Sequence, residues 1–209
     1  EDPLEDLEAM AAYHVRSLRA ASSGPYTLVG WSVGGLLAFE IARQLVALGS
    51  SANVIAIDSY PRDDAASARE AAEVITHFLA DYRALRNEDP KPPFAGSVDI
   101  ADPWRAAIAE GLIDESELDD VKRSFRVFAA NTTASARYRP PAAPVHVHWV
   151  PATSSVAKDA RESARRTWTR LAQGGVQESA VDGDHYSIMR APRVSDIARI
   201  ISSEPHAKR

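Results

Sequence analysis

The chain has 209 residues, of which 45% are hydrophobic and 25% charged, and its 24 basic and 29 acidic residues give a net charge of −5. These values are ordinary for a globular protein, and the length suits one domain with a full-sized core. No apolar run approaches the ~20 residues of a membrane span. The mild acidity and the lack of a basic stripe argue against nucleic acid as the main partner.

The chain contains no cysteine, which excludes a disulfide framework, a cysteine nucleophile and a thiolate zinc site. This composition suits a reducing compartment. The first residues, Glu1–Leu4, are acidic and polar, unlike the start of a signal peptide. We therefore expect a cytoplasmic protein that does not act at a membrane.

The first part of the chain predicts a strand–helix–strand unit. Apolar residues at helical spacing indicate an amphipathic helix over about 4–21. A short buried strand over 26–29 leads through a glycine-rich turn into a second helix, which ends at Gly49. The next strand covers 53–57 and ends at Asp58. Its continuous apolar run is typical of a parallel sheet covered by helices on both faces.

The middle of the chain, about 61–140, predicts helices and loops without a convincing strand, and it includes a polar, proline-rich loop at 87–93. This insertion is far longer than a strand–helix connection requires. It is either an extra helical layer or a lid over a site at the carboxyl edge of the sheet, where α/β proteins bind ligands. We favour a single domain, 1–209, with a lid over about 62–139.

The sheet resumes in the last third of the chain. We expect a strand at 145–150, a helix at 159–172, a short strand at 176–181, a turn at 182–185 and a closing helix at 194–201. The predicted fold is therefore α/β, with a mostly parallel sheet flanked by helices.

A G-x-S-x-G motif spans Gly30–Gly34, between a predicted strand and a predicted helix, as a nucleophile elbow requires. We expect a strained Ser32 whose hydroxyl projects above the sheet edge, with the two motif glycines removing steric clashes. The Val33 backbone N–H, at the helix N-terminus, could then donate to an oxyanion. The alternative is a glycine-rich turn in which Ser32 only caps the helix.

A serine nucleophile requires a base, and histidine has the appropriate pKa. Of six histidines, His185 is the best candidate, because it lies in a turn after a late strand and so reaches the same sheet edge as the elbow. The others lie within predicted helices, within one strand or in the tail: His14, His77, His146, His148 and His206.

The third residue must be a carboxylate that orients the imidazole. Asp58 ends the strand that follows the elbow helix and is our choice. Asp159 is the rival, but its place at a helix start has a simple capping explanation. Asp184 directly neighbours His185, and adjacent loop side chains usually diverge. The order Ser32, Asp58, His185 matches that of α/β-hydrolases.

At this point the sequence resembles a known family, the type I thioesterase domains that end nonribosomal peptide synthetases and polyketide synthases, which are α/β-hydrolases. The resemblance covers essentially the whole chain, and the lid is its least constrained part. The segments that carry it are Gly24–Gly35, Ala38–Leu45, Ile57–Pro61, Asn131, Tyr138–Pro140 and Gly183–Met189.

The resemblance implies that Ser32 accepts an acyl chain from a phosphopantetheine thioester on a carrier domain. His185 would deprotonate Ser32 and then activate water or an internal nucleophile of the chain, while Asp58 orients His185. No metal and no bound redox cofactor are implied. The lead-in Gly24–Tyr26 and the pair Gly34–Gly35 favour a peptide or hybrid peptide–polyketide substrate. Hydrolysis and macrocyclisation both stay open.

Two other functions remain. The enzyme could be a stand-alone esterase or an editing thioesterase that removes stalled acyl groups. A catalytically silent binding module with the same fold is the non-enzymatic alternative.

The sequence departs from the family in one respect. The family has further strands before the first helix predicted here, and a loop among them supplies the second oxyanion donor. Only Val33 can therefore be named as a donor. Because an exposed sheet edge requires neighbours, we expect residues 1–209 alone to fold poorly.

Overall fold

The computed structural model describes residues 3–62, 71–86 and 102–204. The chain forms two compact units. The first, here called the sheet unit, comprises Asp6–Ala65 and Arg137–Arg209, and the second, the helical unit, comprises Glu1–Glu5 and Ala66–Ala136. Every candidate site residue lies in the sheet unit.

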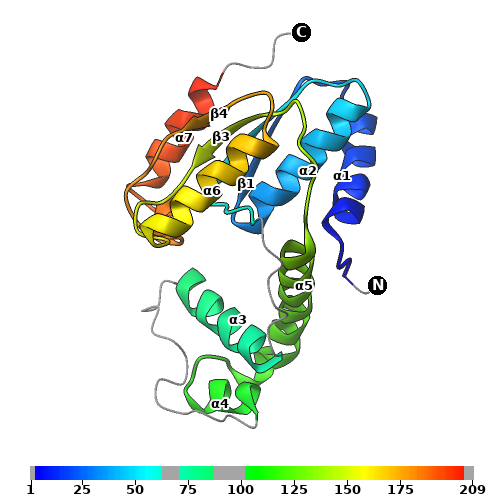
Figure 1. The fold of residues 1–209 in the computed structure, drawn as a ribbon. Coiled ribbons are helices and arrows are strands. Elements are labelled where there is room, and N and C mark those ends of the chain that lie inside the picture. The colour runs from blue at the N-terminus through cyan, green and yellow to red at the C-terminus, as the bar shows by residue number, and fades with distance from the viewer. Residues whose placement is uncertain (1–2, 63–70, 87–101, 205–209) are drawn as a thin grey trace. The chain divides into compact units, whose positions relative to one another are not determined.

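The sheet unit contains four parallel strands in the order β1-β2-β3-β4 (Figure 1). They are β1 (Tyr26–Trp31), β2 (Ala52–Ile57), β3 (His146–Val150) and β4 (Val176–Glu178). Trp31 pairs with Ile57, and Ile57 pairs with Val150, so three strands end at the same carboxyl edge. β4 is shorter than predicted, because beyond it Val181 makes only an isolated bridge with Ala152.

Helices cover both faces of the sheet (Figure 1). On one face lie α2 (Val33–Ala47) and α6 (Lys158–Leu171), which meet through Phe39 and Trp168 at a ring-centroid distance of 5.5 Å. On the other face, α7 (Val194–Ser203) buries Ile197 against Ile55 and Ile57 of β2. α1 (Leu7–Ala21) packs on α2 rather than on the sheet. The layers agree with the predicted α/β architecture.

Local sequence sets the ends of the first two helices. The Asp6 side chain caps α1 by accepting from the Ala9 N–H at 2.7 Å, so the helix begins at Leu7 rather than at residue 4 as predicted. α2 ends before Gly49, whose φ of 83° places it in the left-handed region. Glycine enters that region without steric cost, and Gly49 is the predicted stop.

A buried carboxylate on α2 forms a hydrogen bond with Tyr138, which lies just after the helical unit in the sequence. Glu40 of α2 is fully buried and accepts hydrogen bonds from Arg43 at 2.6 and 2.8 Å, from Gln44 at 2.8 Å and from the Tyr138 hydroxyl at 2.8 Å. Burial and the neighbouring Glu40 charge raise the pKa of Tyr138, which keeps its hydroxyl a donor. Four donors make this buried charge tolerable.

The described residues of the helical unit form helices and their connections without a strand, in agreement with the sequence prediction. They are α3 (Ala71–Leu85), α4 (Pro103–Ala109), the 3-10 helix Glu115–Glu117 and α5 (Leu118–Arg137). Phe78 lies at the centre of its core and contacts the rings of Trp104, Phe125 and Phe128. The predicted loop 87–93 lies outside the described residues, and the role of this unit as a lid stays a prediction.

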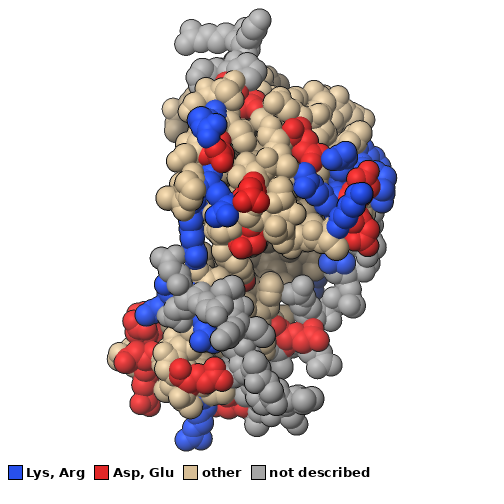
Figure 2. Space-filling view, turned by 90° about the vertical axis from the view of Figure 1, so that its left-hand side faces the viewer, with Lys and Arg blue, Asp and Glu red and all other residues tan. Residues whose placement is uncertain are grey.

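Charges of both signs are mixed on the face shown in Figure 2. On α6, Arg161 and Arg165 both pair with Glu178 of β4, at 2.7 and 2.8 Å. No helix in the described part of the chain is long and apolar enough to cross a membrane.

Candidate active site

Ser32 occupies a strained turn between β1 and α2. Its φ of 58° and ψ of −127° are costly for a residue with a side chain. Two backbone hydrogen bonds hold it there: its N–H donates to Ile57 O at 2.9 Å, and Gly35 N–H donates to its carbonyl at 3.1 Å. Its side chain does not cap the helix. The alternative of a merely capping serine is therefore wrong, and the hydroxyl is left for other use.

The glycines of the turn have different roles. A Cβ on Gly30 would lie 2.0 Å from Gly34 O, so only glycine fits there. A Cβ on Gly35 would lie 2.6 Å from the Ser59 Cβ, which lets α2 approach the end of β2. A Cβ on Gly34, however, meets nothing within 4 Å. The prediction that Gly34 removes a clash by lacking a side chain is wrong, because the tight contact is made by its backbone.

Val33 is the first residue of α2, and its N–H has no backbone acceptor among the described residues. The first N–H groups of a helix are free of intrahelical partners and carry the positive end of the helix dipole. This N–H, adjacent to Ser32, is suited to a negatively charged oxygen.

His185 and Asp58 lie together. His185 Nδ1 is 2.6 Å from Asp58 Oδ2, although the two residues are 127 positions apart in the chain. An ionised carboxylate only accepts hydrogen bonds, so we assign the proton to Nδ1. Nε2 then carries the lone pair and can act as a base.

Asp58 is almost fully buried, and its carboxylate accepts four hydrogen bonds. Oδ1 accepts from the Tyr60 hydroxyl at 2.7 Å and the Ala152 N–H at 2.8 Å, and Oδ2 accepts from His185 and, at 2.5 Å, from the Ser155 hydroxyl. Burial by itself raises the pKa of Asp58, but these hydrogen bonds outweigh it, and the resulting pKa lies below 3.8. Asp58 is therefore ionised near neutral pH.

The backbone beside Asp58 is fixed as well. Asp58 N–H donates to Val150 O at 2.8 Å. The indole N–H groups of Trp149 and Trp168 both donate to the Ser59 carbonyl, at 2.9 and 3.2 Å. β3 and α6 thus fix the position of the turn that carries the carboxylate.

The rival carboxylates do not contact His185 in the described structure. Asp159 is exposed in the first turn of α6. Asp184 folds back on its own loop, where its Oδ1 accepts from the N–H groups of Tyr186 and Ser187 at 2.9 Å each. The structure therefore pairs His185 with the predicted Asp58.

Other histidines are engaged elsewhere or exposed. His148 is buried between Glu204, which bonds its Nδ1, and Ser179, 2.8 Å from its Nε2. His14 and His77 lie on exposed positions of α1 and α3.

Ser32 is connected to His185 through Trp31, which precedes it. The Trp31 ring stacks on the His185 ring at a centroid distance of 4.8 Å and an angle of 28°, and its N–H donates to the His185 carbonyl at 3.1 Å. Within the described residues, the Ser32 hydroxyl makes no direct hydrogen bond to His185. Hydrogen bonds between nucleophile and base are often longer without substrate.

Three contributors to this arrangement were missed by the sequence analysis: Tyr60, Ser155 and the contacts of Trp31. Tyr60 lies two residues after Asp58, and Ser155 lies in the loop after β3, which ends at the same sheet edge. The sequence does show a residue with a hydroxyl group shortly after each of these two strands. Spacing alone, however, does not show whether that hydroxyl points toward Asp58.

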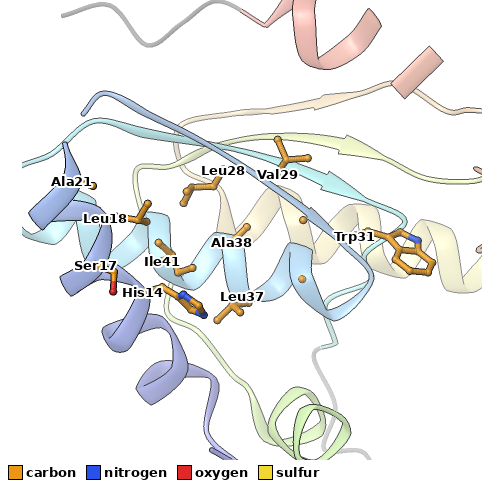
Figure 3. Close-up of a pocket in the computed structure, with 12 residues that line it drawn as sticks. His14, Ser17, Leu18, Ala21, Leu28, Val29, Trp31, Leu37, Ala38 and Ile41 are labelled. Atoms are coloured by element: carbon orange, nitrogen blue, oxygen red, sulfur yellow. The ribbon is translucent and has the colours of Figure 1, made fainter. Parts of the chain in front are cut away.

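A hollow of about 540 Å³ lies beside β1, between α1 and α2, and Trp31 lies at one end of it (Figure 3). Its lining is mainly apolar and includes Leu18, Leu28, Leu37 and Ile41. Within the described residues, β1 pairs only with β2, so the hollow follows a free strand edge. No group of three or more His, Asp or Glu side chains in the described part of the chain is arranged to hold a metal ion.

Comparison with known proteins decides the family. The model of the thioesterase domain matches residues 1–204. The chain belongs to the thioesterase domain family.

Relatives of this thioesterase domain include a non-reducing polyketide synthase from Pseudevernia furfuracea. It is 27% identical over an alignment of 233 residues, gaps included, and the alignment covers 95% of this chain and 10% of that protein. The crystal structure of the NocB thioesterase domain in covalent complex with a fluorophosphonate nocardicin G analogue is 25% identical, with a TM-score of 0.66, and the match covers 94% of this chain and 74% of that one. A four-domain nonribosomal peptide synthetase has a TM-score of 0.78 at 23% identity and is matched over 97% of this chain and 16% of its own.

These matches confirm the predicted family and the predicted α/β-hydrolase fold. The chain is a thioesterase domain of the type found in polyketide synthases and nonribosomal peptide synthetases, a hydrolase family. The matches cover almost the whole of this chain, but the chain spans only 10% and 22% of the length of two curated relatives.

Proposed function

We propose that this thioesterase domain releases an acyl or peptidyl chain from a carrier domain, through an acyl-enzyme on Ser32. The observation that carries the proposal is the hydrogen bond between His185 Nδ1 and Asp58 Oδ2, 2.6 Å long, beside the strained Ser32 turn. This hydrogen bond favours the tautomer with a basic Nε2, Trp31 next to Ser32 stacks on the His185 ring, and the Ser32 side chain makes no capping hydrogen bond to α2.

In the first half of the reaction, His185 Nε2 takes the Ser32 proton as Oγ attacks the thioester carbonyl carbon. The carbonyl oxygen becomes an oxyanion, to which Val33 N–H donates. The C–S bond then breaks, and the phosphopantetheine thiol leaves with the proton from His185. Asp58 stays ionised and stabilises the imidazolium, and its lowered pKa suits that role.

In the second half, His185 takes a proton from the nucleophile that attacks the Ser32 ester. Water as nucleophile gives a free acid, and a hydroxyl or amine within the chain gives a macrocycle. The C–Oγ bond breaks, and the proton returns to Ser32. The phosphopantetheine arrives on the carrier domain, so it is part of the substrate rather than a bound cofactor.

We infer a peptidyl or hybrid chain as substrate, because the segments Gly24–Tyr26 and Gly34–Gly35 resemble those of peptide systems. The second candidate is an editing thioesterase, which would accept short acyl groups of many kinds. The type II thioesterase BorB has a TM-score of 0.62 to this chain, and at 20% identity that likeness concerns the fold alone.

The test is incubation with pantetheine thioesters of peptidyl, polyketide-like and short acyl chains, followed by mass analysis of products and of the intact protein. We expect release of the peptidyl chain and an acyl adduct that Ser32→Ala lacks. Equal turnover of short acyl groups would favour the editing function. Absence of any adduct or product from folded protein would contradict the proposal.

A further inference from the structure

Trp31 holds His185 at two different points. Its indole ring lies against the imidazole face, at 4.8 Å between centroids and 28° between planes. Its N–H donates to the main-chain carbonyl of the same residue at 3.1 Å. One side chain therefore restrains both the ring and the backbone of His185.

His185 needs such restraint because it lies in a loop, between the bridge residue Val181 and the 3-10 helix Ser187–Met189. Its side chain is 29% exposed. Asp58 holds one edge of the ring, Trp31 covers a face, and Tyr186 makes an edge-on contact at 5.2 Å. Asp58 fixes the distance of Nδ1 but leaves rotation about that hydrogen bond, which the stacked ring opposes.

Trp31 is also bonded covalently to Ser32. A residue that contacts the base and directly precedes the nucleophile limits how far the two can move apart. Two side chains 153 positions apart in the sequence thereby share one support.

We propose that Trp31 is a positioning residue, which sets the orientation of the His185 ring relative to Ser32 through the ring stack and the indole N–H. The proposal rests on the proposed function of Ser32 and His185. In the proposed mechanism Trp31 does not touch the reacting atoms and acts only through His185.

The competing explanation is that Trp31 simply fills the core. Its ring packs on the cluster that contains Ile57, Val150 and Ile188, as does the partly buried Ile201 of α7. Ile201→Ala removes apolar volume from the same cluster and provides a matched control for loss of packing.

The experiment compares wild type, Trp31→Phe, Trp31→Leu and Ile201→Ala by three measurements. The first is the second-order rate constant for modification of Ser32 by a fluorophosphonate. The second is the downfield proton resonance of His185 Nδ1–H in its hydrogen bond to Asp58, identified by its loss in Asp58→Asn. The third is the thermal unfolding midpoint.

We expect Trp31→Leu to slow modification about 10²-fold, as misplacement of a catalytic group does, and to broaden or abolish the resonance. Trp31→Phe keeps a stacking ring but loses the N–H donor, so we expect about a fivefold loss and a retained resonance. Ile201→Ala should keep the rate within about twofold, because Ile201 packs on the apolar cluster and is not part of the Trp31–His185 ring stack, while its unfolding midpoint falls.

A Trp31→Leu protein with wild-type rate and resonance overturns the proposal, as does an equal loss of rate in Ile201→Ala. If Trp31→Leu does not fold, Trp31→Phe decides: a wild-type rate there rejects the role of the indole N–H. Failure of the wild type to react at Ser32 would count against the proposed function instead, and the resonance would still test the position of His185.

Discussion

At the scale of single residues, strain and buried charge coincide at one edge of the sheet. The non-glycine residues with positive φ in the described structure are Ser32, at 58°, and Asp58, at 44°. Such conformations persist only where the surroundings determine them. Here the surroundings are backbone hydrogen bonds from β2 and β3, which place both residues at the carboxyl edge.

The hydrogen bond between Asp58 and His185 predicts which carboxylate supports catalysis. Asp58→Asn removes the acceptor that fixes the Nδ1–H tautomer, so we expect kcat to fall by about three to four orders of magnitude. Asp159→Asn is the matched control, because Asp159 is exposed on α6, and its kcat should stay near wild type. The measurement is thioester turnover by both variants, and the reverse result would make Asp159 the acid.

The lowered pKa of Asp58 predicts how stability depends on acid. A carboxyl group with a depressed folded pKa stabilises the protein fully above its unfolded pKa, near 3.8, and loses that contribution as pH falls through the folded value. We expect the unfolding midpoint of wild type to fall more steeply below about pH 4 than that of Asp58→Asn. Parallel curves for the two proteins would show that the hydrogen bonds to Asp58 do not stabilise its ionised form.

The sequence predicts Ser32, Asp58 and His185 because each lies at a strand end or in a turn that local pattern identifies. The structure places them in one unit and pairs two of them directly. Their catalytic roles remain proposals. Tyr60 and Ser155 were not predictable, because the direction of a hydroxyl depends on the approach of β3 to β2, which no local pattern describes.

At the scale of elements, the turn between β1 and α2 depends on backbone contact rather than on glycine content. Gly30 faces the Gly34 carbonyl and Gly35 faces Ser59, whereas Gly34 faces open space. The motif predicted the turn at the correct place. It assigned the second requirement for a missing side chain to Gly34, whereas the structure assigns it to Gly35. The cause is that a motif shows which residues are small, not which neighbours approach them.

This contrast predicts opposite outcomes for two alanine substitutions. Gly30→Ala places a Cβ 2.0 Å from backbone that cannot yield easily, so we expect a loss of about 3 kcal/mol or more in the free energy of unfolding. Gly34→Ala should change the free energy of unfolding by no more than about 1 kcal/mol, because a Cβ fits at this position and alanine forms helices more readily than glycine. Urea denaturation of both variants checks this, and equal losses would contradict the assigned contacts.

The lengths of the elements were predictable where an apolar pattern is continuous, as in β2 and α2. They were less so at β4, which was predicted over 176–181, where Gln177, Glu178 and Ser179 interrupt the apolar pattern. β4 lies at the edge of the described sheet, its residues are partly buried or exposed, and it pairs with β3 over just three positions.

At the scale of the whole molecule, the unpaired edge of β1 is a place where two copies of the chain can associate. The strand pairs on one side only within the described residues, and Val29 on it is 45% exposed. Unpaired strand edges recruit other strands. We therefore expect residues 1–209, produced alone, to self-associate through β1 with rising concentration.

Val29→Lys should reduce this association, since a charge on an edge strand opposes pairing, and should change stability by no more than about 0.5 kcal/mol. Val127→Lys is the control, because Val127 is similarly exposed, at 50%, but lies on α5. Light scattering over a range of concentrations measures the effect. A chain that stays monomeric, or variants that behave alike, would contradict the role of β1.

The proposed reaction depends on Ser32 as the nucleophile and on His185 as its base. The most direct measurement is fluorophosphonate labelling of folded protein, with intact mass analysis and peptide mapping. We expect a single adduct on Ser32, absent in Ser32→Ala and formed about 10²-fold or more slowly in His185→Ala. An adduct on another serine, such as Ser179 beside His148, or no adduct at all on folded protein, would contradict the proposed reaction.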